Sequence, residues 1–362
     1  MTMNPSPFNA AGRPVRRILI VRPSAIGDVV MASAMLPVLS RACPQARICW
    51  LVEPHIVEVL KASPGLSRII TWPKSTWRQL WKDGRWWELL REIRAFVGEL
   101  RRERFDVVLD VQGLLRSRLL AWFTGAPVRI GFDSKEPGRF LLTRVVSRGG
   151  PSRRMGSEYY HLLRELGLEP EPFHPCLDID GADAASAAAA LRSAGVDGAF
   201  VALAPFTTRP QKHWLEERWR QLAGQVGSQC GLPVVVLGGP ADRDAAERIF
   251  AGVARVTLLA GQLRLAETMA VIRQSALLIG VDTGLTHLGP AFARPTVALF
   301  GATCPYLETS RDHTVVIYHQ QPCSPCRRSP TCAGQYPCMA AISVDEVLDQ
   351  ARQMLSTAGA PK

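Results

Sequence analysis

Several features that would place the chain in another class are missing from its sequence. No apolar run reaches the roughly 18 residues that a membrane-spanning helix needs. The first 17 residues contain no apolar stretch followed by a small-residue cleavage site, so we expect no secretory signal and a protein that stays in the cytosol. The motifs G-x-x-x-x-G-K-[ST], G-x-G-x-x-G, H-E-x-x-H and G-x-S-x-G are also absent, so none of these motifs points to a competing enzyme class.

Negative charge is scarce relative to positive charge, and the formal net charge is +11. A basic face attracts phosphates on nucleic acid, on a membrane or on an anionic substrate. No helix-turn-helix, zinc-finger or RRM signature accompanies the charge, so we expect no nucleic-acid partner. A solvated, Arg-rich surface is the alternative interpretation. The excess is concentrated in the first half, in Arg91, Arg94, Arg101, Arg102, Arg104, Arg116, Arg118, Arg129, Arg139, Arg144, Arg148, Arg153 and Arg154.

The nine cysteines do not form an obvious disulfide framework. Five of them are scattered and are expected to be small buried apolar residues. The other four lie close together near the C-terminus and open with a C-x-x-C pair, as some structural zinc sites do. The second pair is five residues apart rather than two, so we expect reduced thiols and no metal, with zinc as the weaker alternative. The four clustered residues are Cys323, Cys326, Cys332 and Cys338.

The apolar periodicity predicts strands that alternate with helices, which indicates α/β architecture with parallel sheets. The expected strands cover 17–22, 47–52, 67–72, 106–110, 200–204, 234–237, 277–280 and 296–300. The expected helical segments cover 29–39, 75–104, 184–193, 214–226 and 241–251.

A Pro-, Asp- and Gly-rich stretch at 169–183 interrupts this alternation and suits a linker. We therefore expect two Rossmann-like lobes, with ligands bound at the carboxyl ends of the strands in a central cleft. The expected divisions are a flexible segment at 1–16, a first lobe at 17–175, a second lobe at 176–340, and a C-terminal helix and tail at 341–362.

The first candidate loop, Ser24-Ala25-Ile26-Gly27-Asp28, follows the first predicted strand. Asp28 falls at the start of a helix, where an Asp often serves as the N-cap. The functional alternative is a carboxylate that removes a proton from an attacking hydroxyl.

The second and third loops follow strands of the second half. Thr207, Thr208 and Lys212 offer hydroxyls, amides and a cation for a diphosphate, although a capped helix start with a solvated Lys explains them equally well. Asp242, after Gly238-Gly239-Pro240, is placed to accept hydrogen bonds from a ribose or to cap a helix.

The fourth loop contains Asp282, Thr283 and Gly284, which are expected to open a helix whose amides suit phosphate oxygens. His287 lies four residues after Thr283 and is expected to reach the same ligand. A structural histidine is the alternative.

Four sequence segments, taken in order and with their spacing, resemble glycosyltransferase family 9, the lipopolysaccharide heptosyltransferases. The segments are LIVRPSAIGDVV, DVVLDVQGLLRS, TTRPQKHWLEERW and GVDTGLTHL, and with their spacing they cover residues 17 to about 310. The resemblance implies a GT-B fold that binds the acceptor in the first lobe and the nucleotide-sugar in the second. It implies inverting transfer of L-glycero-D-manno-heptose from ADP-heptose to a Kdo sugar of the lipid A inner core, with no required cofactor.

The resemblance also implies roles for individual residues. Asp28 matches the general base of the family, and Lys212 would stabilise the departing ADP. Asp242 lies where the family has a Glu that binds the nucleoside. The implied donor residues are Thr207, Thr208, Lys212, Asp242, Leu263, Asp282, Thr283, Gly284 and His287, and additional acceptor candidates are Ser24, Gly27, Gln112 and Arg116.

The implied partners are the nucleotide-sugar donor, an anionic glycolipid acceptor and the cytoplasmic surface of the inner membrane. The tryptophans among basic residues at 77–87 are expected either to contact sugar or lipid, or to form a Trp-rich core helix. Alternatives for the whole chain are a family 9 transferase with another acceptor or another nucleotide-sugar, and a binding protein for nucleotide-sugar or nucleic acid without turnover.

Overall fold

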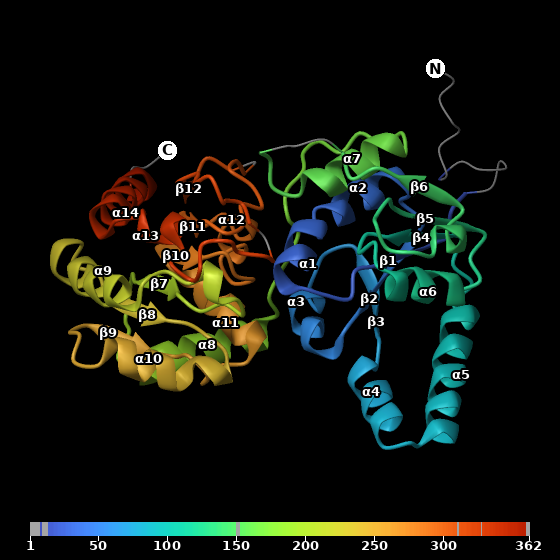
Figure 1. The fold of residues 1–362 in the computed structure, drawn as a ribbon, viewed down its shortest axis with the longest axis horizontal. Helices are drawn as coiled ribbons and strands as arrows, with labels where there is room; N and C mark the ends of the chain where they lie inside the picture. The colour runs from blue at the N-terminus through green and yellow to red at the C-terminus, as the bar shows by residue number, and fades with distance from the viewer. Residues whose placement is uncertain (1–7, 9–13, 150–152, 310, 327, 360–362) are drawn as a thin grey trace. The chain divides into compact units, whose positions relative to one another are not determined.

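The computed structural model describes residue 8 and residues 14–149, 153–309, 311–326 and 328–359. These residues form two compact units. The first unit contains the residues up to 152 and 156–178, and the second contains 153–155 and the residues from 179 onward. Most of the segment expected at 1–16 therefore lies outside the described residues. Each unit is an α/β structure with its own sheet and its own core (Figure 1).

The sheet of the first unit is parallel throughout, with the strand order β3-β2-β1-β4-β5-β6 among the described residues. The central strands are continuous apolar runs and are buried along nearly their whole length, as expected for a parallel sheet covered on both faces. The strands are β1 (Arg17–Val21), β2 (Arg47–Val52), β3 (Leu66–Thr71), β4 (Val107–Asp110), β5 (Val128–Phe132) and β6 (Arg144–Val146).

Helical crossovers connect the strands of the first unit, as parallel pairing requires, with a 3-10 turn alone between β5 and β6. The α-helices are α1 (Ile26–Ala32), α2 (Met35–Ala42), α3 (Val57–Leu60), α4 (Lys74–Lys82), α5 (Trp86–Arg102), α6 (Leu115–Phe123) and α7 (Ser157–Glu165), with 3-10 turns η2 (Pro54–Ile56) and η3 (Arg139–Leu141). One core cluster joins α5 and α6 to strands β1 to β4.

The second unit repeats this design with the order β12-β11-β10-β7-β8-β9, again parallel throughout. Its strands are β7 (Val201–Ala204), β8 (Val234–Val236), β9 (Val256–Leu258), β10 (Leu277–Val281), β11 (Thr296–Phe300) and β12 (Thr314–Tyr318). Its helices are α8 (Gly181–Ser193), α9 (Glu216–Gln229), α10 (Arg243–Phe250), α11 (Leu265–Gln274), α12 (Leu288–Ala291), α13 (Pro337–Ala340) and α14 (Val344–Gly359), with 3-10 turns η4 (Pro210–Lys212) and η5 (Pro240–Asp242).

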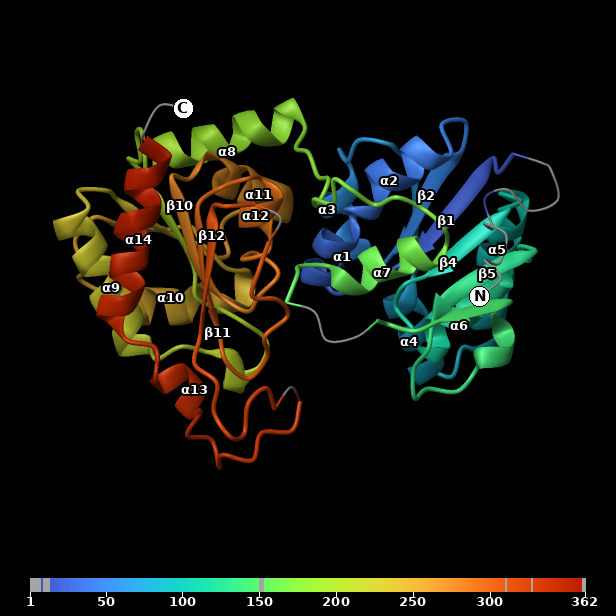
Figure 2. The ribbon, with the colours of Figure 1, turned by 90° about the horizontal axis from the view of Figure 1, so that it is seen from above.

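A core cluster of the second unit lies between its sheet and helices α9, α10 and α14. Helix α14 packs along α9, and α8 packs on α11 (Figure 2). Trp214 and Trp219 meet edge to face at 5.0 Å inside this core, and the Trp214 indole N–H donates to the main-chain oxygen of Ile342. The core therefore ties the segment before α14 to α9.

The expected α/β fold with two parallel sheets is confirmed, but two predicted helices are wrong. The segment expected at 29–39 is split into α1 and α2, and the segment at 75–104 is split into α4 and α5. Gly84 has φ +68 at the second break, a left-handed conformation that glycine adopts without strain. Among the described residues, no helix is both long and apolar enough to cross a bilayer.

Candidate active site

The candidate residues of each unit lie at the carboxyl edge of its sheet. In the first sheet the chain moves outward from β1 to β3 and then restarts on the other side of β1 with β4, which makes a topological switch point between β1 and β4. The second sheet has the same switch point between β7 and β10. Ligands of open α/β sheets bind beyond the strand ends at such points. Most of the predicted loops follow these four strands.

Asp28 is the third residue of α1, and Ala25, rather than Asp28, is the N-cap. The interpretation of Asp28 as an N-cap is therefore wrong, although its Oδ2 accepts a 3.4 Å hydrogen bond from the Ala25 amide. The same Oδ2 lies 2.5 Å from Nη2 of Arg22. The side chain is 39% exposed, and within the described residues its Oδ1 has no hydrogen-bond partner. One carboxylate oxygen is held and the other can accept a proton.

Arg22 positions Asp28. It stands directly after β1, inside the segment LIVRPSAIGDVV, but sequence reasoning assigned it no role of its own. Its Nη1 donates a 2.7 Å hydrogen bond to the main-chain oxygen of Val111, across the switch point. Burial alone would lower the pKa of Arg22, but the acidic groups of Tyr159, Asp28 and Glu158 outweigh burial and raise it. Arg22 therefore remains a buried cation that fixes the direction of the Asp28 carboxylate.

The other candidates of the first unit occupy the same edge but make fewer contacts. Ser24 is half-buried and forms no hydrogen bond with the described residues, and Gly27 is buried in α1. The main-chain N–H of Gln112 donates a 3.1 Å hydrogen bond to Oδ1 of the buried Asp110. The side-chain oxygen of Gln112 is buried without a partner among the described residues. Arg116 is exposed on α6.

Asp282 is the centre of the site in the second unit. Its Oδ2 lies 2.6 Å from Nζ of Lys212 and accepts a hydrogen bond from the Thr303 hydroxyl. Its Oδ1 lies 3.4 Å from Nε2 of His287. The Thr207 hydroxyl donates a 3.3 Å hydrogen bond to its main-chain oxygen. Residues that follow β7, β10 and β11 are thus joined at one carboxylate.

The charges of this cluster depend on one another. Burial alone would raise the pKa of Asp282, but the hydrogen bond and charge of His287 and the ammonium of Lys212 outweigh it and hold the pKa well below its usual value. Asp282 is therefore an anion at neutral pH. Its charge holds Lys212 and His287 at the sheet edge.

Tyr306 supports the cluster from behind. Its hydroxyl lies 2.9 Å from Nδ1 of His287, so both ring nitrogens of the histidine have partners. Burial raises the pKa of Tyr306 far above its ordinary value, so the phenol remains neutral. Tyr306 and Thr303 belong to the segment after β11 and carry no motif, and sequence reasoning missed both.

The helix expected to open at Asp282 is wrong. Residues 282–287 form successive turns, and α12 begins only at Leu288. The Thr286 hydroxyl donates a 2.5 Å hydrogen bond to the main-chain oxygen of Val281, so the chain curls back onto β10 before it becomes helical. Thr283 and Gly284 are half-buried within this turn.

The remaining donor candidates lie on neighbouring loops. Asp242 caps its own turn, because its Oδ2 accepts a 2.8 Å hydrogen bond from the Gly239 amide. The Gly261 amide donates to the main-chain oxygen of Gly238 at 3.1 Å and keeps the loop after β9 beside this turn. Leu263 follows on that loop and is half-exposed. Thr208 is exposed and forms no hydrogen bond with the described residues.

The clustered cysteines show no metal-binding arrangement. All four are free thiols, and Cys338 is buried beside Met339. The residues that the structure describes contain no group of three or more His, Cys, Asp or Glu side chains arranged to hold a metal ion. Burial raises the pKa of Cys326 and Cys338, which favours their protonated forms.

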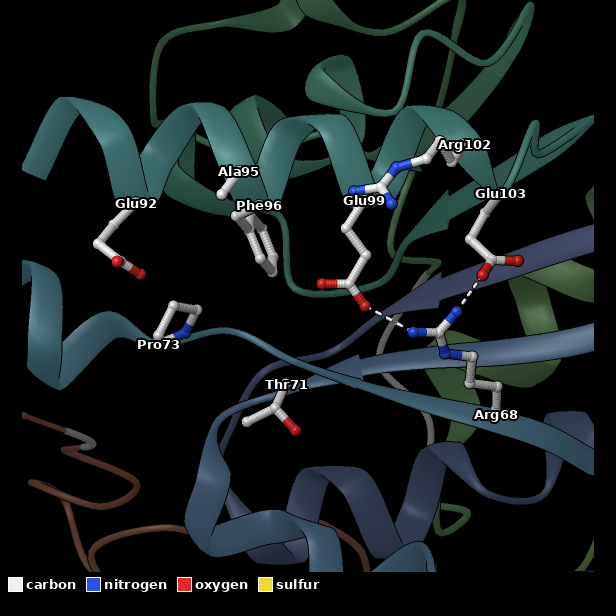
Figure 3. A pocket seen from close by; sticks show the side chains of 9 residues that line it. All are labelled: Arg68, Thr71, Pro73, Glu92, Ala95, Phe96, Glu99, Arg102 and Glu103. Atoms are coloured by element: carbon white, nitrogen blue, oxygen red, sulfur yellow. Dashed lines mark hydrogen bonds and ion pairs between the residues drawn. The ribbon is translucent and has the colours of Figure 1, made fainter.

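A pocket of about 500 Å³ lies elsewhere, between β3 and α5, and contains none of the candidate residues (Figure 3). Arg68 reaches from β3 to Glu99 at 2.6 Å and also pairs with Glu103; Glu99 lies in the last turn of α5, and Glu103 is the residue that caps its C-terminus. These ion pairs brace α5 against the sheet.

Comparison with known proteins agrees with this arrangement. The model of glycosyltransferase family 9 (heptosyltransferase) matches residues 93–336. Lipopolysaccharide heptosyltransferase 1 of Pseudomonas aeruginosa is 30% identical over 88% of each chain. Lipopolysaccharide heptosyltransferase 2 of Salmonella typhimurium is 24% identical over 95% of this chain and 99% of its own.

The fold also matches a solved structure. Escherichia coli heptosyltransferase WaaC, solved with ADP-2-deoxy-2-fluoro heptose, superposes with a TM-score of 0.72 at 24% identity, covering 93% of this chain and 99% of that chain. The two parallel α/β units thus define a glycosyltransferase fold of the GT-B class. The chain belongs to glycosyltransferase family 9, the heptosyltransferases, and is a glycosyltransferase of lipopolysaccharide core synthesis.

Proposed function

We propose that the protein transfers L-glycero-D-manno-heptose from ADP-heptose to a Kdo sugar of the lipid A inner core, with inversion at the anomeric carbon. The higher identity to a heptosyltransferase 1 than to a heptosyltransferase 2 supports the first heptose as the product. The acceptor is lipid-anchored, so we expect the enzyme to work at the cytoplasmic face of the inner membrane.

The proposal rests on the contacts and exposure of the Asp28 carboxylate. Arg22 and the Ala25 amide occupy Oδ2, so the carboxylate is oriented, while Oδ1 is open on a side chain that is 39% exposed. A base for an acceptor hydroxyl needs this combination of fixed direction and a free oxygen. The Kdo oxygen would bond to the anomeric carbon as its proton passes to Oδ1 and the bond between that carbon and ADP breaks.

The donor would be held by the cluster around Asp282. A bare carboxylate repels a diphosphate, so we assign Asp282 the role of holding Lys212 and His287 in place rather than binding phosphate directly. The Lys212 ammonium and the Thr207 and Thr208 hydroxyls would contact the diphosphate and stabilise the charge that develops on the departing ADP. Asp242 and Leu263 lie on the next loops of the same edge and would contact the nucleoside.

The proposal is tested by incubating the purified protein with ADP-heptose and Kdo–lipid A. We expect release of ADP and an acceptor heavier by one heptose, with the anomeric proton of the product showing inversion. Heptosylated Kdo–lipid A as acceptor separates the first transfer from a later one, and a series of other nucleotide-sugars separates ADP-heptose from another donor. Absence of transfer with every donor and acceptor would contradict the proposal and favour a binding protein without turnover.

A further inference from the structure

Three tryptophans are exposed to solvent where α4 ends and α5 begins: Trp81 on α4, and Trp86 and Trp87 on α5. Trp81 is 61% exposed, Trp86 46% and Trp87 83%, and Leu90 beside them is 41% exposed. The Trp81 and Trp86 rings meet edge to face at 4.2 Å, so the two indoles form one apolar surface. Clustered exposed aromatic residues of this kind mark binding surfaces.

These tryptophans are not part of the core of the helix pair. Trp77, one turn earlier, packs edge to face on Trp72 at 6.2 Å and on Phe96 at 5.5 Å, and it fills the space between the sheet and α5. Leu80 and Leu89 are buried in the contact between α4 and α5. The helix pair therefore has its own apolar contact without the three exposed tryptophans.

Helices α4 and α5 extend from the sheet of the first unit as an antiparallel pair, and the exposed tryptophans lie at its far end (Figure 1). The Arg68 ion pairs to Glu99 and Glu103 fix the other end of α5 to β3 (Figure 3). The apolar surface therefore lies at the far end of a helix pair whose other end is fixed to the sheet.

Unpaired cations flank the exposed tryptophans along the chain. Residues 78–94 contain five basic and three acidic side chains. Arg85 pairs with Glu88 at 2.5 Å, but four exposed cations in this stretch have no ion-pair partner among the described residues. The four are Arg78, Lys82, Arg91 and Arg94.

We propose that the end of the α4–α5 pair, defined by Trp81, Trp86, Trp87 and Leu90, inserts into the interfacial region of an anionic lipid bilayer. Indole rings favour the level of the lipid headgroups, and the surrounding cations attract anionic lipids. The choice of a bilayer rests in part on the proposed function, because a lipid-anchored acceptor requires the enzyme to reach a membrane surface. A second copy of the chain fits less well, since residues 78–94 carry five basic and three acidic side chains, and the excess positive charge of the two copies would repel.

Cosedimentation with vesicles tests the proposal without donor or acceptor. We expect the wild-type protein to bind vesicles of phosphatidylcholine with phosphatidylglycerol, to bind phosphatidylcholine alone weakly, and to dissociate as salt is raised. The double variants Trp81→Ser/Trp87→Ser and Lys82→Glu/Arg91→Glu should each bind the anionic vesicles about tenfold more weakly or worse. All four positions are exposed, so circular dichroism should show unchanged folding.

Trp122→Ser is the matched control, because Trp122 is 45% exposed on α6 of the same unit. It should bind like the wild type, and an equal loss of binding would overturn the assignment to the α4–α5 end. Failure of the wild type to bind anionic vesicles at low salt would also overturn it. So would a dimer, detected by sedimentation velocity, that the two double variants abolish. Heptose transfer is measured separately, so transfer without vesicle binding refutes this inference alone.

Discussion

Replacing Asp282 by Asn removes the charge at the centre of the second unit while keeping the shape of the side chain. Lys212 is then left without its counter-charge, although its side chain is only 16% exposed. Removing one partner of a buried ion pair costs roughly 3–5 kcal/mol. Because Lys212 retains some contact with water, we expect the lower end, about 3 kcal/mol at pH 7.

The pH dependence of this loss has a definite sign. The folded-state pKa of Asp282 is depressed, so its charge contributes fully above the unfolded-state pKa of about 3.9. The contribution is lost as pH falls from that value towards the folded-state pKa. The difference between wild type and Asp282→Asn should therefore shrink by about 1.4 kcal/mol per pH unit below pH ~4.

Urea unfolding gives the free-energy difference, and hydrogen exchange of the β10 and β11 amides reports the second unit alone. Asp197→Asn is the matched control, since Asp197 is exposed and makes no ion pair with the described residues. It should change stability by less than about 0.5 kcal/mol. Equal stability of Asp282→Asn and the wild type at pH 7 would refute the view that Asp282 holds this cluster together.

Three further predictions concern the second unit. Lys212→Ala should lower the rate of ADP release by roughly 10²–10³-fold, and an unchanged rate in a transfer assay would exclude Lys212 from the donor site. Tyr306→Phe removes the hydrogen bond to His287 and should cost about 1 kcal/mol in urea unfolding, whereas a neutral change would mean that the hydroxyl does not support the histidine. Metal analysis of fresh protein should find no stoichiometric zinc, and thiol titration of the unfolded chain should find all nine cysteines. A bound metal would restore the zinc interpretation of the cysteine cluster.

Much of the fold follows from sequence pattern, because buried parallel strands are short apolar runs bounded by polar turns. The strands at 47–52 and 296–300 have the predicted bounds. Strands β5, β6, β9 and β12 were missed. β6 and β9 have three residues each, too few for a measurable period, whereas the equally short β8 was predicted because Gly238-Gly239-Pro240 marks a turn after it. The break at Gly84 was missed because the apolar spacing continues on both sides of it.

The site divides in the same way. Asp28, Lys212 and Asp282 could be placed near strand ends because they stand in motifs after apolar runs, and position relative to a strand is encoded locally. Their roles in catalysis and donor binding stay predictions. Arg22 was missed although it lies in the same segment as Asp28, because a single arginine after a strand carries no distinctive spacing. Tyr306 was missed because it reaches His287 from a different loop. The helix predicted at Asp282 failed because the Thr286 hydroxyl bonds to Val281 and favours a turn.

The most direct test of the account is the rate of ADP release by Asp28→Asn with saturating ADP-heptose and Kdo–lipid A. The amide keeps the shape but cannot accept the proton, so the rate should fall by roughly 10²–10⁴-fold. Affinity for ADP-heptose should be retained, and the control Glu165→Gln, at an exposed carboxylate on α7, should be fully active. Turnover of Asp28→Asn at the wild-type rate would contradict the assignment of Asp28 as the base.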